Sequence, residues 1–169
     1  MAKPGKANYS DAKAAIEVAK TWRGGRSIQW AEHGGKGMPD HYKCRSPLEV
    51  NGVIQEALFI DLYFKRSILT GVPDKLCFSL MFNHARVMGL DENGPTRHRN
   101  SVGTGLAHYM QIVDHPHWHI PVPDGTPGYA EPLSRQPIAE LWRIFCLRAN
   151  INDAPVLTLP HQTAQMDLL

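Results

Sequence analysis

Strict alternation of side-chain type is the strongest structural signal in this chain. Large apolar residues occupy every second position from 76 to 82 (Leu76, Phe78, Leu80 and Phe82). Because successive side chains of a β-strand point to opposite faces, this pattern predicts a strand with one buried face. A similar alternation over 54–64 and an extended stretch at 40–50 lie on either side of Asn51-Gly52, a dipeptide typical of tight hairpins. We therefore expect two more strands, paired antiparallel.

The remaining extended segments are shorter and less regular. We expect short strands at 27–33, 105–113 and 155–159. Gly89 and the Asp-x-Asn-Gly-Pro stretch at 91–95 predict a loop, so the strand at 76–82 should continue only to a polar end at His84 and Arg86. The prolines and glycines from 121 to 128 predict a turn-rich connection.

Two segments have the spacing of amphipathic helices. The first runs from Ser10 or Asp11, either of which can cap it, to about Trp22. The second follows Pro137 and ends near Asn150. Strands at hairpin-like spacing between two helices predict an α+β fold, with a mostly antiparallel β-sheet flanked by an N-terminal and a C-terminal helix. We expect one domain over 10–159, a flexible arm at 1–9 and a flexible tail at 160–169.

Composition narrows the class of protein. The chain has 169 residues, of which 43% are hydrophobic and 20% charged, as in an ordinary globular domain. Its net charge of +2 is too small to indicate nucleic-acid binding by itself. The sequence has neither an apolar run of membrane-spanning length nor an apolar signal core, which predicts a cytoplasmic protein without a membrane partner. Three widely spaced cysteines, without a CxxC pair, predict reduced thiols.

Candidate chemistry is concentrated in the stretch Asp-His-Pro-His-Trp-His-Ile at 114–120. If this stretch is extended, His115, His117 and His119 share one face, and Trp118 lies on the other face in the core. Imidazole is the side chain whose ordinary pKa lies nearest neutral pH. The histidine face is therefore the candidate functional site.

One hypothesis for this face is a metal site. His117 and His119 can reach the same ion, such as zinc, at 2.0–2.1 Å. His115 and His119 lie about 13 Å apart at the backbone of a flat strand, so the three histidines should not share one ion. Asp114 could accept a hydrogen bond from the second ring nitrogen of a ligand. A third ligand would come from His84, His98, His108, Asp91 or Glu131. Under this hypothesis the cofactor is zinc or another divalent metal.

A second hypothesis is cleavage of a phosphodiester, as in a small ribonuclease. This reaction needs a base, an acid and cations that stabilise the developing negative charge. His117, His119 and His98 are the candidate catalytic residues. The candidate substrate-binding residues are Arg86, Arg97, Arg99, Asn100 and Tyr129. The expected substrate is RNA or a nucleotide, with or without a metal. The alternative is a module that binds nucleic acid, a nucleotide or a metal without turnover.

Structural roles for the same residues remain open. Histidines on a strand can simply bond to neighbouring backbone, and a lone His84 or His108 is more often structural than catalytic. Asp91 fits the ordinary chemistry of a turn. The sequence predicts no oligomeric state.

The order of these polar residues resembles that in small uncharacterised prokaryotic β-rich proteins, some of them suspected components of toxin-antitoxin or phage-defence systems. The likeness covers about residues 80–133, and this chain departs from it by adding His115 and a proline-rich segment at 121–127. The resemblance implies a shared site and favours nucleic-acid or nucleotide chemistry. The residues that carry it are Arg86, Asp91, His98-x-Asn100, His117-x-His119 and Tyr129-Ala130-Glu131-Pro132-Leu133.

Overall fold

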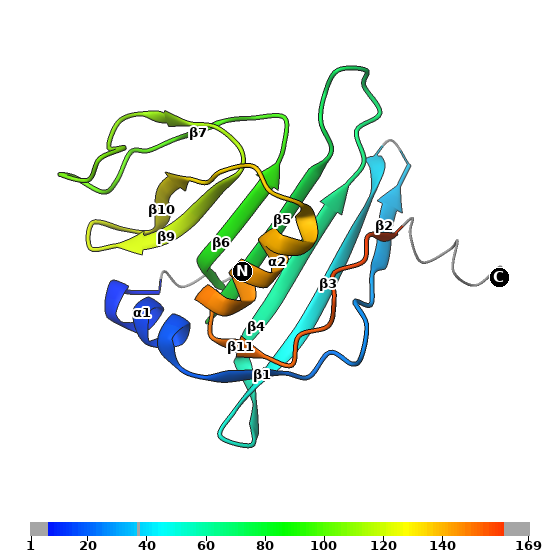
Figure 1. Ribbon diagram of the computed structural model, residues 1–169, viewed down its shortest axis with the longest axis vertical. Helices are drawn as coiled ribbons and strands as arrows, with labels where there is room; N and C mark the ends of the chain where they lie inside the picture. Colours follow the sequence, from blue (N-terminus) through cyan, green and yellow to red (C-terminus); the bar gives the residue numbers. More distant parts are fainter. Residues whose placement is uncertain (1–6, 37, 161–169) are drawn as a thin grey trace.

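The computed structural model describes residues 7–36 and 38–160, and a curved β-sheet dominates this part of the chain (Figure 1). The sheet has the strand order β10-β9-β6-β5-β4-β3-β1-β11, with β2 paired to β3. Neighbouring strands are antiparallel except for β1 and β11. The predicted α+β fold is confirmed. The sheet strands are β1 (Lys20–Trp22), β2 (Ala31–Gly35), β3 (Met38–Val50), β4 (Val53–Lys65), β5 (Lys75–Phe82), β6 (Ala85–Asn93), β9 (His117–Val122), β10 (Gly125–Pro132) and β11 (Ile151–Asn152). The other elements are the small β7 (His98–Arg99) and β8 (Ile112–Val113) pair and the helices α1 (Tyr9–Glu17) and α2 (Ile138–Arg148).

Both helices pack on one face of the sheet, and the apolar core lies between the two layers. The Phe145 ring of α2 lies 5.6 Å from that of Phe78 on β5 and 6.4 Å from that of Trp118 on β9. Ala12 and Ala15 of α1 are buried in the same core. Figure 1 shows α2 in front of the central strands. No described helix covers the opposite face, which we call the open face.

Two tight hairpins organise the central strands. Asn51 and Gly52 join β3 to β4 with φ of 50° and 80°, and both positive angles are what a two-residue hairpin turn needs, as predicted. Asn83 and His84 make a second turn of this kind between β5 and β6, with φ of 47° and 64°. His84 therefore lies at an exposed turn, and Arg86 lies on the next strand, so the predicted polar strand end is wrong.

The loop predicted around Gly89 and residues 91–95 is also wrong over most of its length. Residues 85–93 form β6, which lies between β5 and β9. Val87, Met88, Gly89 and Leu90 are all buried. The glycine and the Asp-x-Asn-Gly sequence favour a turn locally, more strongly than the short apolar run favours a strand. Residues 85–93 are nevertheless a strand, because the two neighbouring strands complete its hydrogen bonds and bury it.

The N-terminal helix is shorter than predicted. Its cap is Asn8, whose side chain accepts a hydrogen bond from the backbone of Asp11, and neither Ser10 nor Asp11 is the cap. The helix ends at Glu17, and Trp22 belongs to β1. The C-terminal helix begins directly after Pro137 as expected, and Asn150 follows it with a φ of 53°.

Several connecting segments differ from the expectations. The predicted strand at 27–33 is displaced to β2, and 105–113 forms turns apart from β8. The predicted irregular stretch at 121–128 is a hairpin between β9 and β10. No strand forms at 155–159 among the described residues; the carbonyl of Pro155 instead accepts a hydrogen bond from Trp142.

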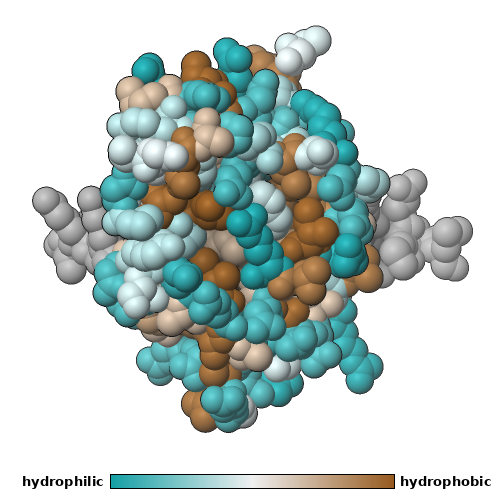
Figure 2. Space-filling model, turned by 60° about the vertical axis from the view of Figure 1, so that its left-hand side comes forward, coloured by the Kyte–Doolittle hydropathy of each residue, from teal (hydrophilic) through white to brown (hydrophobic). Residues whose placement is uncertain are grey.

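The predicted arm and tail fall mainly on residues 1–6 and 161–169, outside the described part of the chain. Within the predicted arm, Ala7 is buried and Tyr9 already begins α1. Of the described helices, none has both the length and the apolar character needed to cross a membrane. On the surface shown in Figure 2, polar side chains are interspersed among apolar ones.

Candidate metal centre

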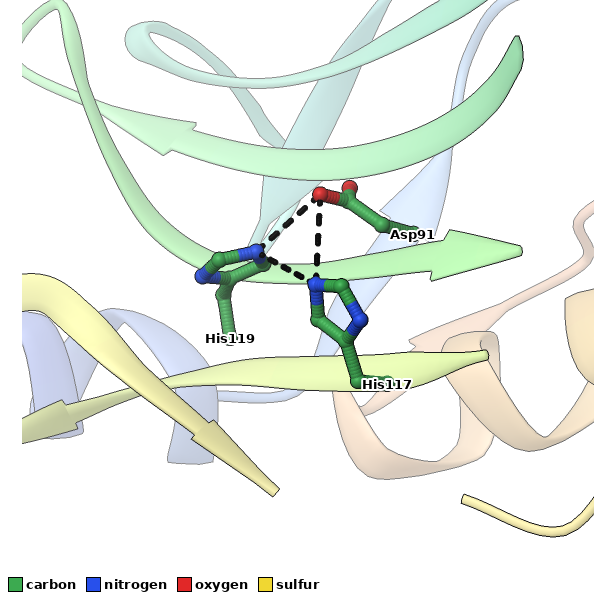
Figure 3. Close-up of side chains that lie close together, drawn as sticks. All are labelled: Asp91, His117 and His119. Atoms are coloured by element: carbon green, nitrogen blue, oxygen red, sulfur yellow. Dashed lines mark hydrogen bonds and ion pairs between the residues drawn. The ribbon is translucent and has the colours of Figure 1, made fainter. Parts of the chain in front are cut away.

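The candidate centre forms on the open face, where β6 and β9 are neighbours. Asp91 is the register partner of His117, and Gly89 is that of His119. Register partners project from the same face of a sheet, so one carboxylate and two imidazoles converge there (Figure 3). The exposed fraction of the side chain is 17% for Asp91, 1% for His117 and 10% for His119.

Three potential ligand atoms face one another within this cluster. Nε2 of His119 lies 3.0 Å from Oδ2 of Asp91 and 3.1 Å from Nε2 of His117. The third side of the triangle, from Oδ2 of Asp91 to Nε2 of His117, measures 3.7 Å. Ligand atoms held 2.0–2.1 Å from a tetrahedral zinc ion are about 3.4 Å apart, so the triangle has the size of one face of such a coordination shell.

The hydrogen atoms available do not satisfy this triangle. Nδ1 of His117 lies 2.9 Å from the carbonyl oxygen of Asp114, to which it donates, so the neutral ring has a bare lone pair on Nε2. Nε2 of His119 carries at most one hydrogen, which can point to Asp91 or to His117 but not to both. Whichever way it points, one lone pair, on Nε2 of His117 or on Oδ2 of Asp91, receives no hydrogen from His119, an arrangement that a cation would stabilise.

The protonation states favour a metal ligand set. Burial lowers the pKa of His117 to about 4, with a further contribution from His119, and burial also lowers the pKa of His119. Burial alone would raise the pKa of Asp91, but the hydrogen bond from His119 and the charge of Arg86 outweigh it and hold this pKa well below its usual range. At neutral pH both imidazoles are neutral and the carboxylate is ionised, as metal binding requires.

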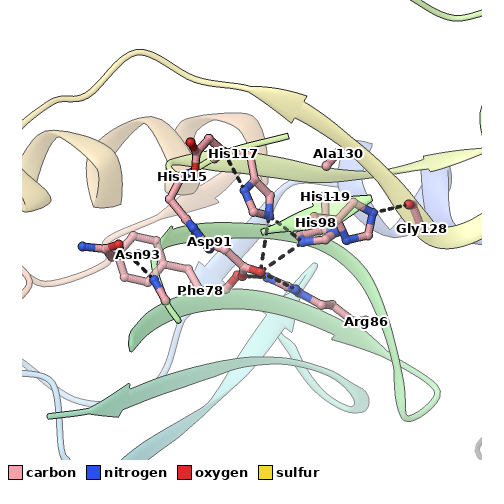
Figure 4. Close-up of polar contacts among 12 residues, drawn as sticks. Phe78, Arg86, Asp91, Asn93, His98, His115, His117, His119, Gly128 and Ala130 are labelled. Atoms are coloured by element: carbon pink, nitrogen blue, oxygen red, sulfur yellow. Dashed lines mark hydrogen bonds and ion pairs between the residues drawn. The ribbon is translucent and has the colours of Figure 1, made fainter. Parts of the chain in front are cut away.

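Arg86 fixes the carboxylate from the side. Its guanidinium donates hydrogen bonds to both oxygens of Asp91 and, at 3.3 Å, to the carbonyl oxygen of Phe78. The shorter of the two bonds to Asp91 goes to Oδ1, which leaves Oδ2 directed at the histidines (Figure 4). Such a partner orients a metal-binding carboxylate mainly through the oxygen that is not the ligand atom.

A β-bulge places Arg86 on the open face. Met88 pairs with Leu80, whereas Arg86 pairs with Met81, so Val87 is an additional residue on β6. This shift changes the alternation of faces and brings Arg86 to the same side as Asp91. The guanidinium crosses the strand directly over Gly89, where a Cβ atom would clash with Nη2 of Arg86.

Two further histidines border the cluster. The His98 ring lies 4.7 Å from that of His119, and its Nε2 donates to the carbonyl of Gly128 over 2.9 Å. The His115 ring lies 4.7 Å from that of His117. The three potential ligand atoms come from Asp91, His117 and His119, and His115 contributes none of them. Figure 4 shows His98 and His115 on either side of the triangle.

Two of the predicted substrate contacts have structural roles instead. The buried amide of Asn100 donates to the carbonyls of His108 and Ala130 and accepts from the N–H of Ala130. The hydroxyl of Tyr129, also buried, accepts from the N–H of His108. These bonds attach the segment around β7 and β8 to β10, so a substrate does not reach either side chain. Sequence reasoning could not separate this role from binding, because both use polar atoms.

The other predicted residues lie in different surroundings. Arg97, directly before β7, and Arg99, within it, are both exposed. His84 lies at the far end of β6, roughly 20 Å of strand away from Asp91. Glu131 forms an ion pair with Arg148 of α2 at 3.4 Å. Among the candidate third ligands, Asp91 is thus the residue that joins His117 and His119, although the sequence favoured a turn there.

No family model, curated protein or solved structure matches this chain. The chemistry of the centre is therefore inferred from its own atoms.

Proposed function

We propose that this protein is a divalent-metal-dependent hydrolase that cleaves phosphodiester bonds in RNA. The observation that supports the proposal is the triangle of Asp91 Oδ2, His117 Nε2 and His119 Nε2, with sides of 3.0–3.7 Å and too few hydrogens to satisfy it. Two histidines and one carboxylate are a frequent ligand set of catalytic zinc and related ions. Three protein ligands leave coordination positions for water or a substrate oxygen.

Each neighbouring group has a role in this proposal. A bound divalent ion supplies a water of lowered pKa and polarises a phosphoryl oxygen. Arg86 holds the carboxylate of Asp91, and the carbonyl of Asp114 orients the ring of His117. His98 donates through Nε2 to Gly128, so the neutral ring has an acceptor at Nδ1. We assign it the transfer of a proton beside the centre.

The charges around the centre favour an anionic substrate. Burial lowers the pKa of His115, and the nearby carboxylates of Asp91 and Asp114 oppose this effect. The charges of Arg135 and Lys75 lower the pKa further, so two cations lie near this ring. Arg97 and Arg99 are exposed on the segment that bears His98. Cations around a metal site attract and stabilise a phosphate group. The proposal also includes a cytoplasmic location, with which three buried free cysteines agree. It further includes the association with toxin-antitoxin or phage-defence systems.

Metal content is the first test. We expect untagged protein to retain close to one equivalent of zinc or manganese, measured by plasma mass spectrometry after dialysis. Asp91→Asn replaces the anionic ligand by a weaker neutral one and His119→Ala removes a ligand atom, so each should lower the content at least tenfold. His84→Ala removes an exposed histidine far from the centre and should retain the metal. Equal metal content in all four proteins would contradict the site.

RNA cleavage is the second test. We expect the protein to cut fluorescently labelled RNA oligomers, EDTA to abolish the cleavage, and added zinc or manganese to restore it. Cleavage that resists EDTA but disappears in His117→Ala would identify metal-free acid–base catalysis instead. Metal and RNA binding without any cleavage would identify the alternative, a binding module.

A further inference from the structure

A basic pocket lies on the open face, close to the metal centre but separate from it. It has a volume of about 410 Å³ and lies between the 66–74 loop and the adjoining ends of β4 and β5. Tyr63, Lys65, Arg66 and Lys75 contribute to its wall, together with apolar side chains of the loop. Among the described residues that line it, none is acidic. A pocket of this size accommodates a small organic group, and its charges select an anion.

The aromatic wall of the pocket is supported from behind. The Tyr63 ring is stacked on His41 at 5.5 Å, and His41 is stacked on His33 at 5.6 Å. On Tyr63, Nζ of Lys75 lies 5.5 Å from the ring centroid. Lys75 lines the pocket and His41 does not, so the ring face toward Lys75 is the one that faces the pocket. A planar base can stack on that face if the flexible lysine moves to a phosphate.

The pocket and the metal centre are adjacent. A Cβ atom on Gly94 would lie 3.4 Å from Nε2 of His115 and 3.7 Å from Cγ of Lys75, so Gly94 lies directly between these side chains. Across the sheet, Tyr63 pairs with Cys77 and Cys77 pairs with Asp91. Tyr63 is thus two strands away from the centre, roughly 10 Å. One ligand can therefore contact both places at once.

We propose that the pocket binds a nucleotide of single-stranded RNA, with the base on Tyr63 and phosphate oxygens at Lys65, Arg66 and Lys75, while an adjacent phosphodiester lies at the metal centre. This inference rests on the proposed function and adds the substrate class to it. Aromatic rings beside a basic groove are the usual means of binding single strands. Bases in a duplex are paired and stacked and cannot enter such a pocket. Asp74 of the same loop does not line the pocket, and its carboxylate accepts a hydrogen bond from the backbone of Ser67.

The test measures RNA binding without cleavage. Fluorescence anisotropy of a labelled ten-nucleotide RNA in EDTA gives the Kd for the wild type, Tyr63→Leu and the double variant Lys65→Gln/Lys75→Gln. We expect a roughly tenfold or greater rise in Kd for Tyr63→Leu, because the side chain keeps its apolar bulk but loses its stacking face. The double variant should also bind more weakly, and its affinity should depend less steeply on salt.

Matched controls distinguish the pocket from general surface effects. Tyr109→Ala changes an exposed tyrosine elsewhere and Lys13→Gln an exposed lysine of α1, and both should bind RNA as the wild type does. Thermal melting confirms that every variant is folded. A duplex of the same sequence and a mononucleotide should each bind at least tenfold more weakly than the single-stranded RNA.

The inference is overturned if Tyr63→Leu and the double variant, both folded, bind with unchanged Kd, or if duplex RNA or a mononucleotide binds as tightly as the single strand. Its failure can be distinguished from that of the proposed function. Binding that depends on Tyr63 without any cleavage would disprove the hydrolase and keep the pocket. Metal-dependent cleavage with unchanged Kd and KM in Tyr63→Leu would disprove the pocket and keep the hydrolase.

Discussion

At the scale of single residues, the geometry of the centre depends on one missing side chain. Arg86 reaches Asp91 only because the strand between them bears no Cβ at Gly89. The carboxylate is then held by a guanidinium on one side, and its remaining oxygen points toward His117 and His119. A glycine in a strand usually weakens it, and here it permits the close approach of a functional side chain.

Gly89→Ala is therefore expected to displace Arg86 and to lower the free energy of unfolding by about 1–3 kcal/mol, through crowding and the loss of a charged hydrogen bond. Metal affinity should fall as well, because Asp91 loses its orienting partner. Urea denaturation and a metal titration measure the two effects. Gly35→Ala is the control: its φ is not positive and a Cβ there would meet nothing within 4 Å, so it should change neither quantity appreciably.

At the scale of elements, a buried lysine terminates α1 and joins it to the sheet. Lys20 begins β1 and is 1% exposed. Its Nζ donates to three carbonyl oxygens in the last turn of the helix and just after it. These acceptors belong to Ala15, Ile16 and Val18, at 2.7, 2.9 and 2.5 Å. Burial lowers the pKa of Lys20 to about 8, which leaves the amine mainly charged at neutral pH. A cation at this position also complements the helix dipole.

Lys20→Met should lower the free energy of unfolding by about 2–4 kcal/mol, because one buried and two partly buried carbonyls lose their donor. Chemical denaturation monitored by tryptophan fluorescence checks this value. Lys13→Met, which removes an exposed lysine of the same helix, should cost less than about 0.5 kcal/mol. Similar losses of unfolding free energy in the two variants would show that Lys20 has no special role in ending the helix.

At the scale of the whole molecule, burial protects the cysteines on both faces of the sheet: Cys44 and Cys146 lie in the core between the two layers, whereas Cys77 pairs with Asp91 on the open face. Cys44, Cys77 and Cys146 are all buried and free. Burial raises the pKa of Cys77 and of Cys146 to about 12, and it also raises the pKa of Cys44. Since the thiolate is the reactive form, these thiols are both inaccessible and protonated at ordinary pH.

We accordingly expect native protein to resist alkylation by iodoacetamide at pH 8 for as long as it stays folded. Mass spectrometry should show all three cysteines modified together once urea unfolds the chain. Rapid modification of one cysteine in the absence of denaturant would indicate local opening of the layer around it.

The sequence by itself determined those features that depend on neighbours along the chain. Alternation specified the strand at 76–82, the Asn51-Gly52 pair specified a hairpin, and helical spacing after Pro137 specified α2. The period of two also put His117 and His119 on one face. These signals are local, since they arise from backbone geometry and from the side on which apolar groups must be buried.

The tertiary structure alone decided which polar residues meet. Residues 85–93 become a strand because β5 and β9 pair with both of its edges, although its glycine and acidic residues favour a turn locally. That pairing brings Asp91 to His117, and a single-residue bulge turns Arg86 to the same face. Contacts between β10 and the segment around β7 and β8 likewise make Asn100 and Tyr129 internal braces. The histidine stretch thus indicated a site from the sequence. The third residue of that site, Asp91, depends on the pairing of β6 with β9 and lies 26 residues before His117, so no local pattern encodes it.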